Sequence, residues 1–162
     1  MALSKKFELH VERMSKFLCL LDIYFEILKG NVNHSRSKSW TSILIEVVYA
    51  YFYSIIDDRE DSINMFRVWR DEYPDHIVEI EKVESLVYPY KGYFMLLRNN
   101  VGFHGSIKQK GKKVGMKIFK EVDGSKTLEL MVAVRDLSTH LLTLNERDKS
   151  KLPKYSCIVC DN

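Results

Sequence analysis

Apolar residues recur every three or four positions through most of this chain. Between Ser4 and Leu28 they are Phe7, Val11, Met14, Phe17, Leu18, Leu21, Tyr24, Phe25 and Leu28. This spacing predicts a helix, with Ser4 as its N-cap and Gly30 as the residue that stops it. The stretch from Gly30 to Ser39 has no apolar pattern, so we expect an exposed connector there.

A second helix is predicted from Trp40 to Ile56, with Ser39 as its cap. Its residues are apolar on nearly every side, which indicates a central helix with several neighbours. A membrane span needs roughly 20 apolar residues. Glu46 interrupts this run and charged residues at 57–59 close it, so we expect a bundle helix and no membrane span.

Further helices are predicted over 62–73, over 77–87 and from near Ser125 to Leu144. Pro89 should kink the chain or begin a fresh helix, from which apolar side chains continue inward. They are Tyr93, Phe94, Leu96 and Leu97. The glycine-rich and lysine-rich segment at 102–120 should be a loop with a short helix. Together these elements predict an all-α, up-and-down helical bundle with one or two short extra helices.

The length of 162 residues matches one domain, expected at 1–150, with a charged and flexible tail at 151–162. The N-terminus lacks the long apolar core of a secretory signal, and 3 cysteines make a disulfide framework improbable, so we expect a cytoplasmic protein. Cys157 and Cys160 have zinc-knuckle spacing but no second pair. We therefore expect no metal ion and no cofactor.

Basic residues concentrate after position 107, although the net charge of +3 does not by itself identify a nucleic-acid-binding protein. Candidates to bind RNA phosphates are Lys108, Lys110, Lys112 and Lys113, and Lys117 and Lys120 follow them with no acidic residue in the cluster. The alternative is an ordinary solvated loop.

The segment Leu96-Leu97-Arg98-Asn99-Asn100-Val101-Gly102-Phe103-His104 places an arginine and a histidine at the end of an apolar helix. Cleavage of RNA through its own 2′-hydroxyl needs a base near that hydroxyl and positive charge near the phosphate. A histidine titrates near neutrality, and an arginine offers a planar fork to two phosphate oxygens. We therefore predict His104 as acid or base, Arg98 as the charge stabiliser and Asn99 as a positioning residue.

This segment resembles the signature of the HEPN (higher eukaryotes and prokaryotes nucleotide-binding) superfamily, an arginine followed after four to six residues by a histidine, often with asparagine next to the arginine. Residues 53–64 also look like a bacterial subgroup linked to abortive infection, and the resemblance covers about Trp40 to Ser106. Membership implies a dimer of helical bundles with metal-independent ribonuclease activity in phage defence or toxin-antitoxin biology. Asp57 and Asp58 are candidates to orient His104 or Arg98, although acidic residues at a helix end are also ordinary turn formers.

A two-fold dimer follows from the spacing as well. Six positions along a helix correspond to about 9 Å of rise and roughly 120° of rotation, too much for one chain to hold one phosphate with both groups. Pairing two copies lets Arg98 of one subunit serve His104 of the other. An antitoxin or regulatory protein is a further expected partner. Ser106 replaces the tyrosine that is nucleotidylated in some HEPN toxins, so we expect no such modification.

Two other interpretations remain open: a non-catalytic HEPN module that binds RNA or nucleotide, and a helical protein-interaction dimer in which the Arg98 region only stabilises the dimer. The remaining histidines stand alone in the sequence and are expected on the surface or on a helix face. They are His10, His34, His76 and His140.

Overall fold

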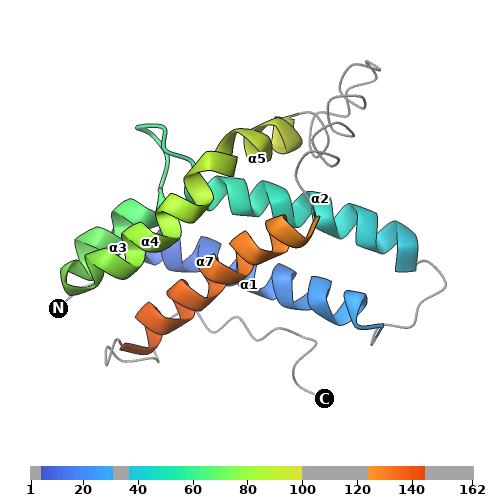
Figure 1. The fold of residues 1–162 in the computed structure, drawn as a ribbon, viewed down its shortest axis with the longest axis horizontal. Helices are drawn as coiled ribbons and strands as arrows, with labels where there is room; N and C mark the ends of the chain where they lie inside the picture. Colours follow the sequence, from blue (N-terminus) through green and yellow to red (C-terminus); the bar gives the residue numbers. More distant parts are fainter. Residues whose placement is uncertain (1–4, 31–36, 100–123, 145–162) are drawn as a thin grey trace.

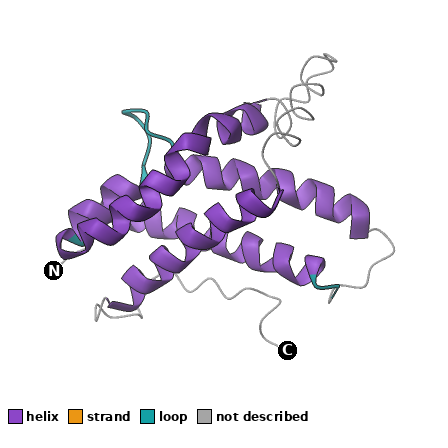
Figure 2. Ribbon diagram, viewed as in Figure 1, coloured by secondary structure: helices purple, strands orange, loops and turns teal. Residues whose placement is uncertain are grey.

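The computed structural model describes residues 5–30, 37–99 and 124–144, and these residues are mostly helical, with no strand among them (Figures 1 and 2). The predicted all-helical bundle is therefore confirmed as a class. Helix α1 (Lys5–Leu28) and helix α2 (Ser37–Ile56) lie side by side and run in opposite directions (Figure 1). The predicted Ser4 cap and most of the predicted connector lie outside the described residues.

Helix α1 has the bounds that its apolar spacing predicts. It ends at a left-handed glycine, because Gly30 has φ 76° and donates its N–H to the carbonyl of Ile27 at 3.0 Å. Its buried face consists of Phe7, His10, Val11, Met14, Phe17, Leu21 and Tyr24. His10 was expected on the surface or on a helix face; it lies on the buried face of α1 and is 0% exposed.

Helix α2 occupies the centre of the bundle, as its apolar sequence predicts, and packs against both α1 and helix α5 (Lys91–Leu97). The ring of Phe52 is fully buried and contacts Phe17 of α1 and Phe94 of α5, with ring centroids 5.5 and 4.7 Å apart. The helix begins at Ser37 rather than Trp40, so Ser39 is a helical residue and not the cap. A polar first turn carries no apolar periodicity, and the sequence pattern therefore placed the start too late.

Helix α3 (Met65–Glu72) begins after Asn64, not at Ser62 as predicted. Pro74 then starts a short 3-10 turn, η1 (Pro74–His76), which leads into helix α4 (Ile77–Val87). The second proline also lies in a 3-10 turn, η2 (Tyr88–Tyr90). Helices α4 and α5 follow each other along nearly one line across this turn (Figure 1), so the chain changes helix type at Pro89 without reversing direction.

Helix α5 turns only part of its apolar sequence inward. Phe94 is 0% exposed, but Leu96 is 37% exposed and Met95 is 39% exposed. The prediction that Leu96 faces the core was therefore wrong. Successive helical residues are about 100° apart, so a residue two positions after Phe94 points to nearly the opposite side.

Helix α7 (Gly124–Leu144) closes the bundle and packs against α4. Its start lies one residue from the predicted one, and its buried apolar residues are Leu130, Met131, Val134, Leu137 and Leu141. Among the helices of the described ranges, none combines the length and apolarity needed to cross a bilayer. The predicted tail at 151–162, with Cys157 and Cys160, lies outside the described residues, as does the loop predicted at 102–120.

Candidate functional site

Arg98 and Asn99 lie at the end of α5, where the chain continues in a wider, π-type turn. Turns of this type are rare and often occur at functional sites. Arg98 is partly buried and Asn99 is exposed. The third predicted catalytic residue, His104, lies outside the described residues, and so do Ser106 and the four predicted RNA-binding lysines (Lys108, Lys110, Lys112 and Lys113).

The guanidinium of Arg98 lies over the ring of Tyr53, with its central carbon 5.5 Å from the ring centroid. A cation over an aromatic face is attracted by the ring's quadrupole. Tyr53 is only 4% exposed, so the ring is held by the core of the bundle. Burial raises the pKa of Tyr53, as do the negative charges of Asp57 and Asp58, while Arg59 and Arg98 act in the opposite direction. The tyrosine therefore stays neutral at physiological pH and gives Arg98 a fixed support.

Arg98 also lines an open hollow of about 610 Å³ between α1 and α2. Its other lining residues are Leu9, Glu12, Arg13 and Lys16 from α1, and Ala50, Tyr51 and Ser54 from α2. Three cationic side chains thus face one carboxylate, and Glu12 is paired with Lys16 at 2.6 Å. The hollow therefore has an excess of positive charge and suits an anion.

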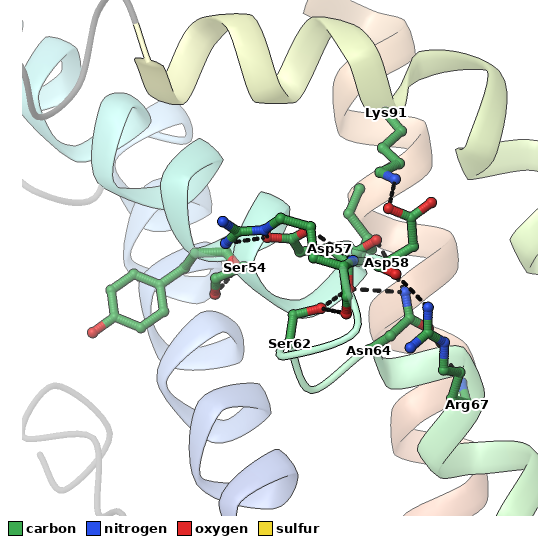
Figure 3. A network of polar contacts seen from close by, with 10 residues as sticks. Ser54, Asp57, Asp58, Ser62, Asn64, Arg67 and Lys91 are labelled. Carbon is green, nitrogen blue, oxygen red and sulfur yellow. Dashed lines mark hydrogen bonds and ion pairs between the residues drawn. The ribbon is translucent and has the colours of Figure 1, made fainter.

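Asp57 is 2% exposed and forms an ion pair with Arg59, two residues further along the chain. Its carboxylate accepts hydrogen bonds from the Nε of Arg59 at 2.9 Å and from the Arg59 backbone N–H at 3.3 Å. Asp58 forms an ion pair with Lys91, the first residue of α5 (Figure 3). The hydrogen bond from Lys91 lowers the pKa of Asp58, and Tyr88 donates a further hydrogen bond to it at 3.3 Å.

Among the described residues, therefore, neither aspartate is paired with Arg98. Their contacts are those of turn residues, which was the alternative interpretation of this pair. Because His104 lies outside the described residues, the predicted contact of either carboxylate with it stays a prediction. Through Lys91, Asp58 nevertheless positions the start of the helix that carries Arg98.

Asn64 connects the end of α2 to the start of α3, as Figure 3 shows. Its side-chain nitrogen donates to the carbonyls of Ile56 and Asp57, at 3.0 and 3.3 Å. Its side-chain oxygen accepts from the N–H groups of Phe66 and Arg67, at 3.0 and 3.2 Å. Donor and acceptor are both used in a buried position, so this asparagine fixes the turn on which both aspartates lie.

The sequence interpretation did not single out Asn64, Tyr53, Lys91, Arg13 or Lys16. An asparagine before an apolar run is a recognisable N-cap pattern, so Asn64 could have been found. Arg13 and Lys16 are three positions apart on α1 and therefore share a face, but nothing in the sequence relates that face to Arg98. No group of three or more histidine, cysteine, aspartate or glutamate side chains that could hold a metal ion occurs within the described ranges.

The chain matches no known protein-family model, and comparison with curated protein sequences and with solved structures gives no significant match. The chemistry around Arg98 is therefore what points to a function.

Proposed function

We propose that this chain is a helical bundle of the HEPN type that works as a homodimer and cleaves RNA without a metal ion. The observation that carries the proposal is the setting of Arg98. Its guanidinium lies on the buried ring of Tyr53 at 5.5 Å and borders an open hollow with an excess of positive charge. A supported, partly solvent-accessible arginine is suited to bind a phosphate whose charge changes during a reaction.

In the proposed reaction His104 removes the proton from the 2′-hydroxyl of the RNA, and the resulting oxygen attacks the adjacent phosphorus. The bond from phosphorus to the 5′-oxygen of the next nucleotide breaks, and that oxygen takes a proton from water. The products are a 2′,3′-cyclic phosphate and a free 5′-hydroxyl. Arg98 stabilises the charge on the phosphate, Asn99 positions the reacting groups, and no cofactor takes part.

Apolar side chains around Arg98 support the proposed dimer. Met95 and Leu96 lie two or three positions before it and are 39% and 37% exposed. Contact with a second copy would remove this apolar surface from water. Two-fold pairing at this place would also bring the two arginine and histidine motifs to one cleft.

The proposed setting is the cytoplasm, in phage defence or toxin-antitoxin biology, with an antitoxin or other regulatory protein as a partner. In this proposal the lysines Lys108, Lys110, Lys112 and Lys113 hold flanking phosphates of the RNA. Such contacts do not depend on base sequence and weaken with salt.

The experiment is an assay of the purified protein on single-stranded RNA in the presence of EDTA. We expect cleavage that His104→Ala lowers by about 10²-fold or more, the usual contribution of a general acid or base. Arg98→Ala should lower it by a similar factor. His140→Ala is the matched control, because His140 is exposed on α7 and should leave the rate unchanged.

Circular dichroism and light scattering establish that each variant is folded and dimeric. The proposal is contradicted by a wild-type protein that does not cleave RNA, by activity that EDTA abolishes, or by a His104→Ala variant as active as the wild type.

The second candidate is a non-catalytic module that binds RNA or nucleotide, and the cationic hollow favours it. Such a module keeps its affinity for RNA but shows no cleavage in the same assay. A helical protein-interaction dimer would show neither activity, and its dimer would weaken in the Arg98→Ala variant.

A further inference from the structure

The hollow beside Arg98 receives two of its cations from α1, a helix outside the arginine and histidine motif. Arg13 is exposed, and the side chain of Lys16 is 43% exposed, so both reach solvent. Lys16 is paired with Glu12, whereas the described ion pairs include none for Arg13. An anion in the hollow would therefore meet Arg13 and Arg98 directly, with Lys16 adjacent.

The size of the hollow fits a ligand of nucleotide size. Its volume of about 610 Å³ falls in the range of about 300–1,000 Å³ that is typical of small-ligand sites. Ala50, Tyr51 and Ser54 of α2 line it with uncharged groups. It is open and borders Arg98, so a chain bound at Arg98 can continue into it without a break.

We infer that this hollow is a second phosphate-binding subsite, in which Arg13 and Lys16 hold the backbone of single-stranded RNA next to the phosphate bound at Arg98. The inference rests on the proposed function, because it takes Arg98 as the place of the scissile phosphate. It adds that the bound RNA is single-stranded and that the strand runs from Arg98 along α1, away from α5.

The chemistry of the lining favours RNA over a single small anion. Each nucleotide adds one phosphate, so a strand with one phosphate at Arg98 necessarily brings a neighbouring phosphate close to it. Axes of packed helices are about 8–10 Å apart, and a groove between two such helices accepts one strand more readily than a duplex. Single-stranded RNA is accordingly the expected ligand.

The test measures binding separately from cleavage. A fluorescein-labelled, fully 2′-O-methylated single-stranded oligoribonucleotide has no 2′-hydroxyl to attack the phosphate, so its affinity can be measured by anisotropy without turnover. For the Arg13→Gln, Lys16→Gln double variant we expect affinity roughly tenfold lower, as for lost hydrogen bonds to charged groups. The slope of log affinity against log salt should shrink by about 1.4, for two lost phosphate contacts on a single strand.

The matched control is the Lys29→Gln, Lys82→Gln double variant, which removes the same charge from exposed positions outside the hollow. Its affinity and salt slope should stay close to those of the wild type. Equal losses in both double variants, or no loss in the Arg13 and Lys16 variant, overturn the subsite, as does a wild-type protein that does not bind the oligonucleotide. If the Arg13→Gln, Lys16→Gln variant loses as much affinity for duplex RNA as for single-stranded RNA, the assignment to single strands is overturned.

A cleavage assay separates this inference from the proposed function. A dinucleotide has no phosphate beyond the scissile one, so the Arg13 and Lys16 variant should cleave it like the wild type, while its KM for a longer strand rises roughly tenfold. If the wild type cleaves nothing, the proposed nuclease fails, and the binding result still decides the subsite.

Discussion

His10 lies on the buried face of α1. It is 0% exposed, and its ring meets Trp69 edge to face with centroids 4.6 Å apart. Neither of its ring nitrogens has a hydrogen-bond partner among the described residues. Burial lowers the pKa of His10 to about 3, and the positive charge of Arg13 acts in the same direction. The imidazole is therefore neutral in the folded protein at physiological pH.

This pKa predicts a loss of stability in mild acid. An unfolded chain protonates His10 near pH 6.5 and the folded protein only near pH 3, so its stabilising contribution is complete above pH 6.5 and falls as the pH falls toward 3. The expected slope is about 1.4 kcal/mol per pH unit. Between about pH 7.5 and about pH 5, the free energy of unfolding of the wild type, measured with urea, should fall by about 2 kcal/mol. The His10→Leu variant should not show this fall.

The control for this measurement is His140→Leu, which replaces an exposed histidine. This variant should keep the pH dependence of the wild type. The same pH dependence in His10→Leu and the wild type would show that His10 is accessible to protons in the folded state.

The burial of His10 was predictable, although we expected this residue only on the surface or on a helix face. It lies three positions after Phe7 and four before Met14, on the apolar face of α1, so periodicity pointed inward and only the polar residue type pointed outward. The contact that supports Arg98 could not be predicted in this way. The motif could be found in the sequence, but the contact with Tyr53 depends on how α5 crosses α2, and no local pattern contains that information.

At the scale of elements, the turn from α2 to α3 depends on Asn64. Replacing Asn64 by alanine removes the cap of α3 and leaves the buried carbonyls of Ile56 and Asp57 without this donor. We expect the free energy of unfolding to fall by about 2 kcal/mol. Asn64→Asp keeps the accepting oxygen but loses the donating nitrogen, so its loss should be smaller. Urea unfolding checks both variants, and an alanine variant as stable as the wild type would refute this account of the turn.

Helix boundaries were predictable where an apolar pattern or a conformational requirement marked them. The start of α7 at Gly124 lay within one residue of expectation, and Gly30 ended α1 as predicted. The predicted start of α3 at Ser62 was three residues too early. In the structure the Ser62 hydroxyl donates to the carbonyls of Asp57 and Arg59, at 2.5 and 2.7 Å, which leaves the capping to Asn64.

At the scale of the whole molecule, a site shared between subunits predicts complementation. In the proposed homodimer, Arg98→Ala and His104→Ala protomers that are unfolded and refolded together in equal amounts would form half mixed dimers by chance. If arginine from one subunit serves histidine from the other, each mixed dimer contains one intact site of two, and the mixture should recover about a quarter of the wild-type activity. Sites formed within one chain, or sites that need all four groups, would leave the mixture inactive.

The hollow could not be predicted from the sequence, because it depends on how three helices pack together. Its lining comes from α1, α2 and the end of α5, and each of these helices contributes residues that look like ordinary surface in isolation. Arg13 and Lys16 have the spacing of any solvated helix face. Only the packing of the three helices places them beside Arg98.

Helix α5 is attached to α2 and to the turn that follows α2: Lys91 at its start pairs with Asp58 of this turn, Phe94 packs on Phe52, and Arg98 at its end lies on Tyr53. A helix of 7 residues has almost no stability alone, so it persists only through these attachments. Melting α5 would therefore expose Phe94 and disturb the central helix of the bundle. An inhibitor of the proposed nuclease would therefore gain more by blocking access to the guanidinium than by unwinding the short segment that presents it.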